Sequence, residues 1–225
     1  PIIIWFRKDF RLADHKALCE ASRSGRPIIP VVVLDEVTET FGAAPKWRLA
    51  QAIEHFNDRL KAVGSRLILR RGTVADELLA LAQETGAGDI WWTRAYDPDA
   101  IMRDTKVKSS LKEAGIGAES WPGHLLFEPW AVTTKQGGFF KVYSPMWRAV
   151  KDLDVAPPDP APLRLMAPQK WPDSDRLSGW ALDKSMDRGA KVLARHANVG
   201  ESAAHARLAN FLSGSIGAYK ERRDY

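Results

Sequence analysis

Short apolar runs recur along the first half of the chain, each separated from the next by a segment of helical length. The runs are rich in β-branched and aromatic residues, as is typical of strands buried on both faces of a parallel sheet. They are PIIIWF at 1–6, PIIPVVVLD at 27–35, RLILR at 66–70, DIWWTRA at 89–95 and IGAESW at 116–121. All five are far shorter than a membrane span, so the pattern favours a water-exposed α/β domain.

The segments between the runs carry helix signals. One stripe of apolar residues has steps of four, three, four and three, which is the spacing of one helix face, and Gly64 follows it. The stripe consists of Leu49, Ile53, Phe56, Leu60 and Val63. We therefore expect a helix over residues 46–63.

Residues at the starts of three other segments favour helix caps. Asp14 is expected to cap a helix over residues 15–25, and Thr73 with Asp76 resembles a capping box. Asp97 followed by Pro98 matches the N-cap and first position of a helix that runs to about residue 114.

The alternation of strands and helices predicts an α/β fold. We expect a five-stranded parallel Rossmann-like sheet with helices on both faces and right-handed crossovers, assigned to residues 1–130. Ligands of such sheets bind beyond the carboxyl ends of the strands, near the switch in strand order. The loops that follow the five predicted strands are therefore the candidate binding loops.

The pattern changes after Pro122. Six prolines between Pro157 and Pro172 disfavour long helices and predict an extended linker that wraps a surface. Residues 131–195 are therefore assigned to a long interdomain connector. Helical patterning then returns, and residues 196–225 are assigned to the first helix of an incomplete helical segment.

The last helical segment carries an apolar stripe that suggests a missing partner. The stripe consists of Leu208, Phe211, Leu212, Ile216 and Tyr219. We expect this stripe to face a helical domain outside the given sequence, and the tail to be frayed or held by a neighbouring molecule in its absence.

Composition excludes several kinds of site. The single cysteine, Cys19, allows no internal disulfide and no cysteine metal site, which favours the cytoplasm. The five histidines lack metal-ligand spacing, so no metal site is predicted. Neither G-x-G-x-x-G, nor a P-loop, nor G-x-S-x-G occurs. A net charge of +5 permits nucleic-acid binding, but 28 acidic residues are interspersed with 33 basic ones, so charge alone decides nothing.

The loop after the first predicted strand concentrates charge. Arg7, Lys8, Asp9, Arg11 and Asp14 follow the strand directly. Arginine forks can bind carboxylate or phosphate groups of a ligand. Alternatively, Asp9 and Asp14 pair with Arg7 and Arg11 to hold the loop, and both interpretations remain open.

Basic and aromatic residues alternate in the stretch TKQGGFFKVYSPMWRAV at 134–150. These side chains could form a stacking face for nucleic acid or pack against a neighbouring domain. The overlapping stretch HLLFEPWAVTTKQGGFFKVYSPMW at 124–147 turns at Gly137 and Gly138, so it is expected to form a hairpin or an ordered crossover arm.

Taken together, four segments resemble the amino-terminal part of the DNA photolyase and cryptochrome family. They are WFRKDFRLADHKAL, in which Phe10 and His15 depart from the usual leucine and asparagine, then YDPDAIMRDTKV, GGFFKVYSPMWRA and VGESAAHARLANFLSGSIGAYKERRDY. The resemblance implies a light-driven lyase in which reduced FAD splits pyrimidine dimers in damaged DNA, with a second, antenna chromophore in the α/β domain. A cryptochrome photoreceptor is the close alternative, and a stand-alone nucleotide-binding α/β module is a more distant one.

The resemblance also implies which residues contact the cofactors. Tyr219 maps to a flavin contact near the FAD phosphates, and no catalytic residue is assigned in this chain, which is expected to be inactive alone. The implied antenna residues are Leu34, Asp35, Lys46, Arg48, Arg94 and Asp97. Folate-binding members carry an acid where Ala100 stands here, so a deazaflavin or flavin antenna, or an empty pocket, is favoured over folate.

Overall fold

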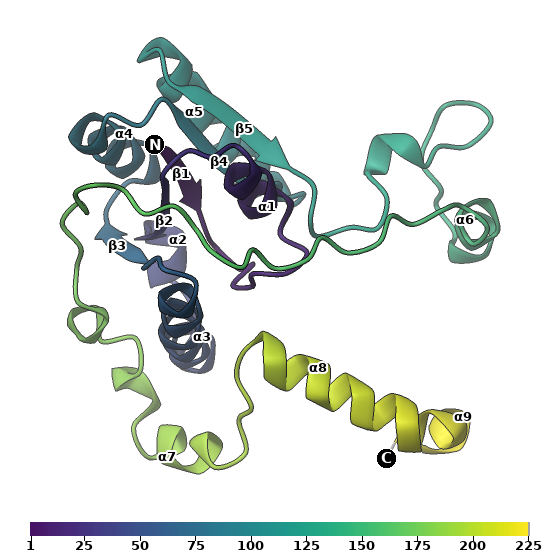
Figure 1. Cartoon of the computed structure of the whole chain (residues 1–225). Helices are drawn as coiled ribbons and strands as arrows, with labels where there is room; N and C mark the ends of the chain where they lie inside the picture. The colour runs from purple at the N-terminus through teal and green to yellow at the C-terminus, as the bar shows by residue number, and fades with distance from the viewer. Residues whose placement is uncertain (225) are drawn as a thin grey trace.

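The structure, a computed structural model, describes residues 1–224 and contains one parallel sheet with the strand order β3-β2-β1-β4-β5 (Figure 1). The five strands are β1 (Ile2–Trp5), β2 (Ile28–Leu34), β3 (Ile68–Arg71), β4 (Asp89–Thr93) and β5 (Gly117–Trp121). All four strand pairs are parallel, with Ile3 opposite Ile29 on one side and Ile90 on the other. The predicted fold class is confirmed.

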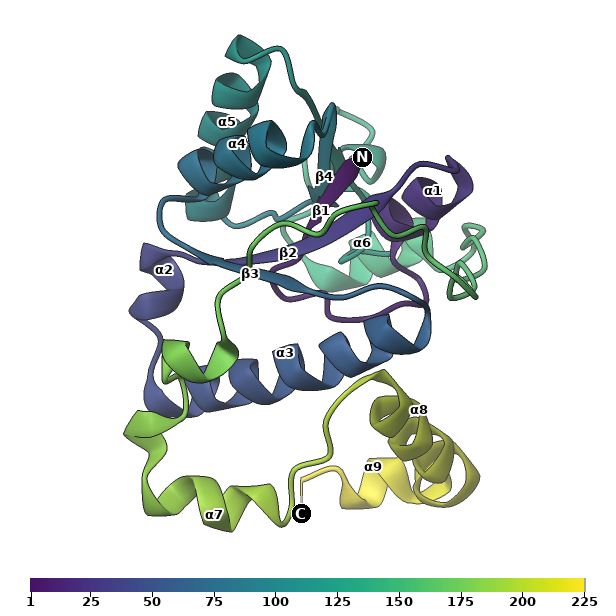
Figure 2. The ribbon, with the colours of Figure 1, turned by 60° about the vertical axis from the view of Figure 1, so that its left-hand side comes forward.

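Alternate side chains of β1 enter two separate cores, because successive side chains of a strand point to opposite faces. Ile2 and Ile4 pack in the core that contains residues of helices α1 (Lys16–Arg23) and α3 (Ala43–Ala62). Ile3 packs in the second core, with residues of α4 (Val74–Thr85) and α5 (Pro98–Glu113). The sheet is therefore covered by helices on both faces (Figure 2).

Most of the expected helices form, and the short helix α2 (Glu36–Glu39) is an addition. Asp97 caps α5 as predicted, because its Oδ1 accepts a hydrogen bond from the Ala100 N–H at 3.0 Å. Thr73 precedes α4 but makes no side-chain cap bond, so the expected capping box is absent. Within residues 1–224, no helix is both long and apolar enough to cross a membrane.

The predicted cap of α1 is wrong. His15 caps this helix instead of Asp14, since its Nδ1 accepts the Leu18 N–H at 3.1 Å. Asp14 has a positive φ of 51° and is held by its backbone, whose N–H donates to the Asp159 carbonyl at 2.7 Å. An imidazole one position later thus replaces the expected carboxylate.

The connector lies along the α/β unit in extended form, as the prolines predict. Residues 154–176 form no helix or strand. Backbone hydrogen bonds join Ile28 to Met166 and Leu165 to Val63, both at 2.8 Å, and Leu165 is buried in the core of α1 and α3. Further along, η2 (Leu177–Trp180) buries Trp180 in the same core. The connector is therefore part of the core of the α/β unit.

The stretch at 124–150, called the arm below, projects away from the sheet (Figure 1). It contains a 3₁₀ turn, η1 (Pro129–Ala131), and the helix α6 (Tyr143–Val150). Gly137 adopts a positive φ of 81° in a turn closed by the Thr134 N–H, which donates to the Gly138 carbonyl at 2.7 Å. No strand flanks this turn among the described residues, so the arm forms and the hairpin does not.

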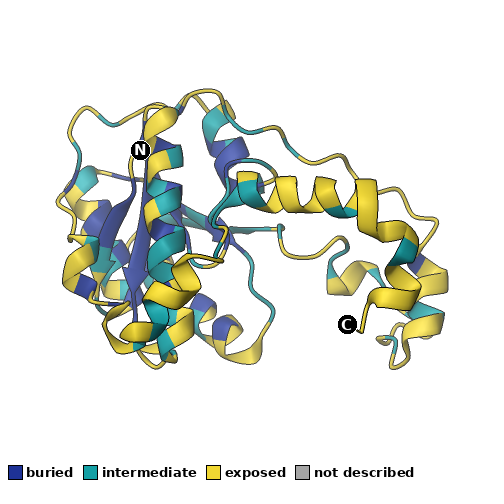
Figure 3. Cartoon of the chain, turned by 90° about the horizontal axis from the view of Figure 1, so that it is seen from below, coloured by how far each residue is buried: buried dark blue, intermediate teal, exposed yellow. Residues whose placement is uncertain are grey.

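The end of the chain is helical and exposed. It consists of η3 (Lys184–Met186), α7 (Arg188–Ala194), α8 (Glu201–Asn210), a π turn (Phe211–Ser215), η5 (Ile216–Ala218) and α9 (Tyr219–Arg222). Leu208, Leu212, Ile216 and Tyr219 are all about half exposed (Figure 3). The expected fraying is absent, since α8 is rich in helix-forming residues such as Ala and Leu. Tyr225, part of the predicted tail, lies outside the described residues.

Candidate functional site

A cavity of about 180 Å³ lies beyond the carboxyl ends of β1, β2 and β4. Trp5 and Phe6 come from the end of β1, Leu34 and Asp35 from the end of β2, and Asp97 from the loop after β4. The chain leaves β1 toward β2 and later returns to pair β4 on the other side of β1. The cavity therefore occupies the switch point at which such sheets bind ligands.

Trp5 lines this cavity as a buried ring and lies near two guanidinium groups. The Cζ of Arg7 lies 4.4 Å from the Trp5 ring centroid and the Cζ of Arg103 lies 5.2 Å from it. Both distances allow cation–π attraction. The cavity thus combines a rigid aromatic ring with donors suited to the acceptor atoms of a flat or anionic ligand.

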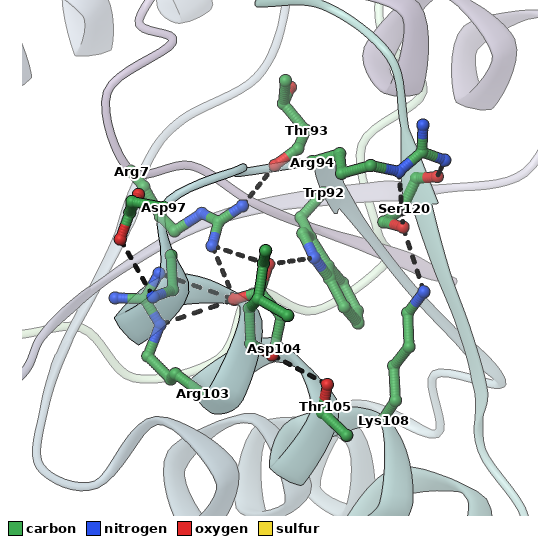
Figure 4. Close-up of polar contacts among 12 residues, drawn as sticks. Arg7, Trp92, Thr93, Arg94, Asp97, Arg103, Asp104, Thr105, Lys108 and Ser120 are labelled. Atoms are coloured by element: carbon green, nitrogen blue, oxygen red, sulfur yellow. Dashed lines mark hydrogen bonds and ion pairs between the residues drawn. The ribbon is translucent and has the colours of Figure 1, made fainter. Parts of the chain in front are cut away.

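Asp104, on α5, orients these donors (Figure 4). Its two carboxylate oxygens accept hydrogen bonds from Arg7 Nη1 at 2.7 and 3.0 Å. The indole Nε1 of Trp92 donates to the same carboxylate at 3.0 Å. Arg7 also donates to the Thr93 carbonyl. The buried Asp104 thus joins α5 to β4 and to the loop after β1.

The ion pair between Arg103 and Asp35 separates this cavity from a second one. Arg103 Nη1 lies 3.2 Å from Asp35 Oδ2, while Asp35 Oδ1 caps α2 by accepting the Thr38 N–H at 2.8 Å. The second cavity measures about 660 Å³ and shares Asp35, Val37, Asp99 and Arg103 with the first. The two spaces therefore adjoin at this ion pair.

A buried Asp9–His15 pair holds the loop after β1. His15 Nε2 lies 2.8 Å from Asp9 Oδ2, and the side chains are 0% and 2% exposed. Because Nδ1 of His15 accepts the Leu18 N–H, the ring proton lies on Nε2 and points to Asp9. Burial raises the pKa of the Asp9 carboxyl, but the electrostatic attraction and hydrogen bond of His15, with hydrogen bonds from Thr93 and the Arg7 N–H, outweigh burial and hold the pKa well below its usual range.

The loop is thus a structural network, although its pairs differ from those expected. Arg7 pairs with Asp104 instead of Asp9. Arg11 does contact Asp14, mainly at the backbone carbonyl at 2.7 Å and only at 4.0 Å from the carboxylate. Lys8 lines the cavity, so the ligand-binding interpretation of the loop also stays open.

Three of the six predicted antenna residues, Leu34, Asp35 and Asp97, line the first cavity. Lys46 lines a separate cavity of about 520 Å³. Arg48 faces the tail, where its guanidinium lies 3.5 Å from the Asn198 carbonyl.

Arg94, the sixth, points toward β5 and the arm. Its guanidinium donates to the Ser120 carbonyl at 2.7 Å and to Glu128 Oε1 at 2.8 Å, and its Cζ lies 5.1 Å from the Trp130 ring centroid. Its backbone N–H continues the sheet by donating to the Trp121 carbonyl. Local partners therefore hold Arg94 away from the cavity.

Tyr219, the predicted flavin contact, lies apart from these cavities. Its ring packs edge-on against Phe211 at 6.0 Å between centroids, and it is 53% exposed. Tyr219 lines none of the three cavities described above. No step of a reaction is therefore assigned to it.

Several cavity residues were not among the predicted antenna contacts. Trp5, Arg7 and Arg103 all line the cavity, and the last two lie in sequence segments that already showed paired Arg and Asp residues. Trp180 also lines it, from the connector, with its indole Nε1 donating to Asp175 at 2.9 Å. No local signal marks Trp180, because it reaches the cavity only through the path of the connector.

Comparison with known proteins gives consistent matches. The family model described as DNA photolyase matches residues 2–163. The deoxyribodipyrimidine photo-lyase of Agrobacterium fabrum is 38% identical over 227 residues, which cover 100% of this chain and 47% of that protein. Cryptochrome-1 of Arabidopsis thaliana is 30% identical over 230 residues, which cover 98% of this chain and 33% of that protein.

A solved structure extends the match to three dimensions. The crystal structure of a bacterial class III photolyase from Agrobacterium tumefaciens has a TM-score of 0.94 to this chain at 37% identity. The match covers 100% of this chain and 47% of that one. The chain thus spans about half the length of its photolyase relatives.

Proposed function

The chain belongs to the DNA photolyase family, and from this membership we propose that it is the amino-terminal part of a deoxyribodipyrimidine photolyase. Such an enzyme is a light-driven carbon–carbon lyase that uses FAD to repair cyclobutane pyrimidine dimers in DNA. Residues 1–130 form the antenna domain, residues 131–195 the connector, and residues 196–225 the start of the FAD domain in this proposal. A cytoplasmic location accords with the single buried Cys19.

The cavity beyond β1, β2 and β4 is the proposed antenna site. The observation that carries this assignment is the Trp5 ring with Arg7 and Arg103 close to it, at the switch point of the sheet. These residues suit a chromophore with polar edges, since the guanidinium groups offer donors and the buried Trp5 ring supports them from behind. A bound antenna would absorb light and pass the excitation energy to the flavin.

A deazaflavin or flavin is proposed as the antenna in preference to folate. Ala100 is buried and lines the cavity, at the position where folate-binding members carry an acid. Of the three acids that line the cavity, Asp35 and Asp97 cap helices, and Asp99 precedes Ala100 on α5, where adjacent side chains do not share a face. Arg103 is then the residue best placed to meet a polar edge of the chromophore.

FAD and damaged DNA are assigned to the remainder of the full-length protein. Tyr219 would lie near the FAD phosphates there, and a flipped lesion would reach the flavin in that remainder. The exposed apolar stripe of the tail supports such a partner domain, since side chains of this size are normally covered. The 225-residue chain alone is expected neither to hold FAD nor to repair DNA.

Titration of the purified chain tests the antenna site. FMN, a deazaflavin and methenyltetrahydrofolate are added separately, and binding is followed by chromophore fluorescence. We expect the deazaflavin or FMN to bind, and Arg103→Gln to weaken binding by about tenfold to a hundredfold, the usual loss for a hydrogen bond to a charged group. Arg48→Gln is the matched control, because Arg48 lies outside the cavity.

Different results of these measurements would overturn different parts of the proposed function. Tighter binding of the folate would overturn the antenna identity, and silence from all three chromophores would overturn the antenna site. A flavin absorbance band that copurifies with the chain, together with light-dependent dimer splitting, would contradict its expected inactivity.

A cryptochrome-type photoreceptor is the second candidate. The observation that favours it is the 30% identity to Cryptochrome-1 of Arabidopsis thaliana across 98% of this chain. A repair assay on the full-length protein decides between the two. Flavin photoreduction without dimer splitting would favour the photoreceptor, whereas light-dependent dimer splitting would favour the photolyase.

A further inference from the structure

The first residue of α8 is bound to the loop after β1, almost two hundred positions earlier in the sequence. Glu201 Oε2 accepts the Leu12 N–H at 3.1 Å, and its Oε1 accepts the Ala13 N–H at 3.0 Å. A carboxylate that accepts two backbone N–H groups makes stronger hydrogen bonds than a neutral acceptor does. Glu201 thus joins the tail to the α/β unit by a bidentate contact.

The backbone conformation of Gly200 allows Glu201 to make this contact. Gly200 has a positive φ of 93°, and a Cβ at this position would lie 2.0 Å from His55 Nε2 on α3. Any side chain at position 200 would therefore face both backbone strain and a collision with α3. The close approach brings Glu201 within reach of the loop.

Contacts of α8 with the α/β unit are concentrated at this point. Most of the residues after Glu201 in this helix are exposed, and Figure 1 shows α8 leading away from α3 and the sheet. Among the hydrogen bonds of residues 1–224, the two to Glu201 are the ones that join α8 to the sheet domain. The direction of α8 therefore depends on Glu201.

The loop that Glu201 binds is the same loop that lines the cavity. Arg7 and Lys8 line the cavity, and Leu12 is buried in the core beside them. The Asp9–His15 pair holds the middle of this loop rigidly. A shift at Glu201 would consequently change the placement of the tail relative to the cavity without removing a cavity residue.

We propose that Glu201 is a positioning residue that sets the distance and orientation between the antenna cavity and the flavin held by the rest of the protein. This inference rests on the proposed photolyase function. Its role is geometric, since the side chain touches neither the cavity nor Tyr219. Loss of the bidentate contact should reduce energy transfer from the antenna while leaving the chemistry at the flavin intact.

The decisive experiment uses the full-length holoprotein with both chromophores bound. Dimer repair is measured with light in the antenna band and, separately, with light absorbed by the flavin alone. For Glu201→Ala, we expect repair driven by the antenna to fall relative to repair driven by the flavin. Glu201→Gln, which keeps one acceptor oxygen, should fall in between, and Ser202→Ala, an exposed neighbour on α8, should match the wild type.

Amide hydrogen exchange in the 225-residue chain checks the contact without any cofactor. In Glu201→Ala, the amides of Leu12 and Ala13 should exchange about tenfold to a hundredfold faster, the loss expected for hydrogen bonds to a charged acceptor. Unchanged protection of these amides would contradict the contact.

The repair measurement distinguishes this inference from the proposed function. If the wild-type holoprotein shows no dimer repair at all, the proposed function fails, and if it repairs dimers only with light absorbed by the flavin, the antenna site and this inference fail together. If the wild type shows antenna-driven repair and Glu201→Ala retains the same ratio, this inference alone is overturned.

Discussion

The sheet and the tail contain similar apolar side chains, which are buried in the sheet and exposed in the tail. Every residue of β1 and β2 is buried, whereas none of the described residues from α8 onward is (Figure 3). The strands have helices on both faces within the same chain, so burial removes their side chains from water. The tail has an equally apolar stripe with no covering element in residues 1–224. An apolar sequence therefore predicts that its side chains are to be buried, but it does not identify the element that covers them.

The largest difference in stability between the two regions is expected when a buried and an exposed phenylalanine are each replaced by alanine. Phe56, on α3, is 1% exposed and packs against Phe6 at 4.7 Å between centroids, while Phe139 in the arm is 74% exposed. Phe56→Ala should lower the free energy of unfolding by about 3–5 kcal/mol because it leaves a cavity in the core. Phe139→Ala should change it by less than about 0.5 kcal/mol.

Urea denaturation followed by circular dichroism measures both variants of this pair. Equal losses would break the comparison, because they would mean that the arm packs against the α/β unit as firmly as α3 does.

A smaller effect is expected from the buried Asp9–His15 pair. Asp9→Asn should lower the free energy of unfolding at pH 7 by about 2–3 kcal/mol, since it removes a buried hydrogen bond to a charged group. The exposed control Asp14→Asn should change little, because Asn tolerates the positive φ at this position.

The pH dependence of the Asp9 variant has a definite sign. The pKa of Asp9 is lowered in the folded chain, so its contribution is complete above the unfolded pKa of about 3.9 and declines as pH falls toward the folded pKa. The difference between wild type and Asp9→Asn should therefore be constant near neutral pH and shrink below about pH 4. Denaturation midpoints across about pH 2.5–8 measure it, and a difference that grows in acid would contradict the assignment.

The smallest effect is expected in the tail. Leu208→Ser with Leu212→Ser should change the free energy of unfolding of the α/β unit by less than about 0.5 kcal/mol, because both side chains are about half exposed. The same pair should reduce any self-association of the chain, which sedimentation velocity measures. A loss of stability as large as that of Phe56→Ala would show that the tail packs on the α/β unit in solution.

Much of the fold could be predicted because its signals are local. The apolar stripe from Leu49 to Val63 forms the core-facing side of α3, and Asp97 with Pro98 starts α5. The cap of α1 was not predicted, because Asp14 has a positive φ and its backbone N–H donates to the carbonyl of Asp159 in the connector. A contact so distant in sequence leaves no local pattern.

The candidate site was predicted less completely than the fold. Asp35 and Asp97 line the cavity, since each follows a strand or lies in the loop after one at the ligand-binding edge. Arg94 also follows a strand, yet it pairs with Glu128 and the Ser120 carbonyl on the far side of the β4 end. Position after a strand thus limits where a side chain lies but not which way it points.

The sequence alone determined the order of strands and helices, the extended connector and the edge of the sheet where the cavity lies. These follow from side-chain period, proline geometry and the rule that parallel strands end together. Tertiary structure decided the pairing of Arg7 with Asp104, 97 residues apart, and the contact of Glu201 with Leu12, 189 residues apart. Such pairs depend on how distant segments pack, because hydrogen-bonding groups accept any complementary partner that the fold brings within reach.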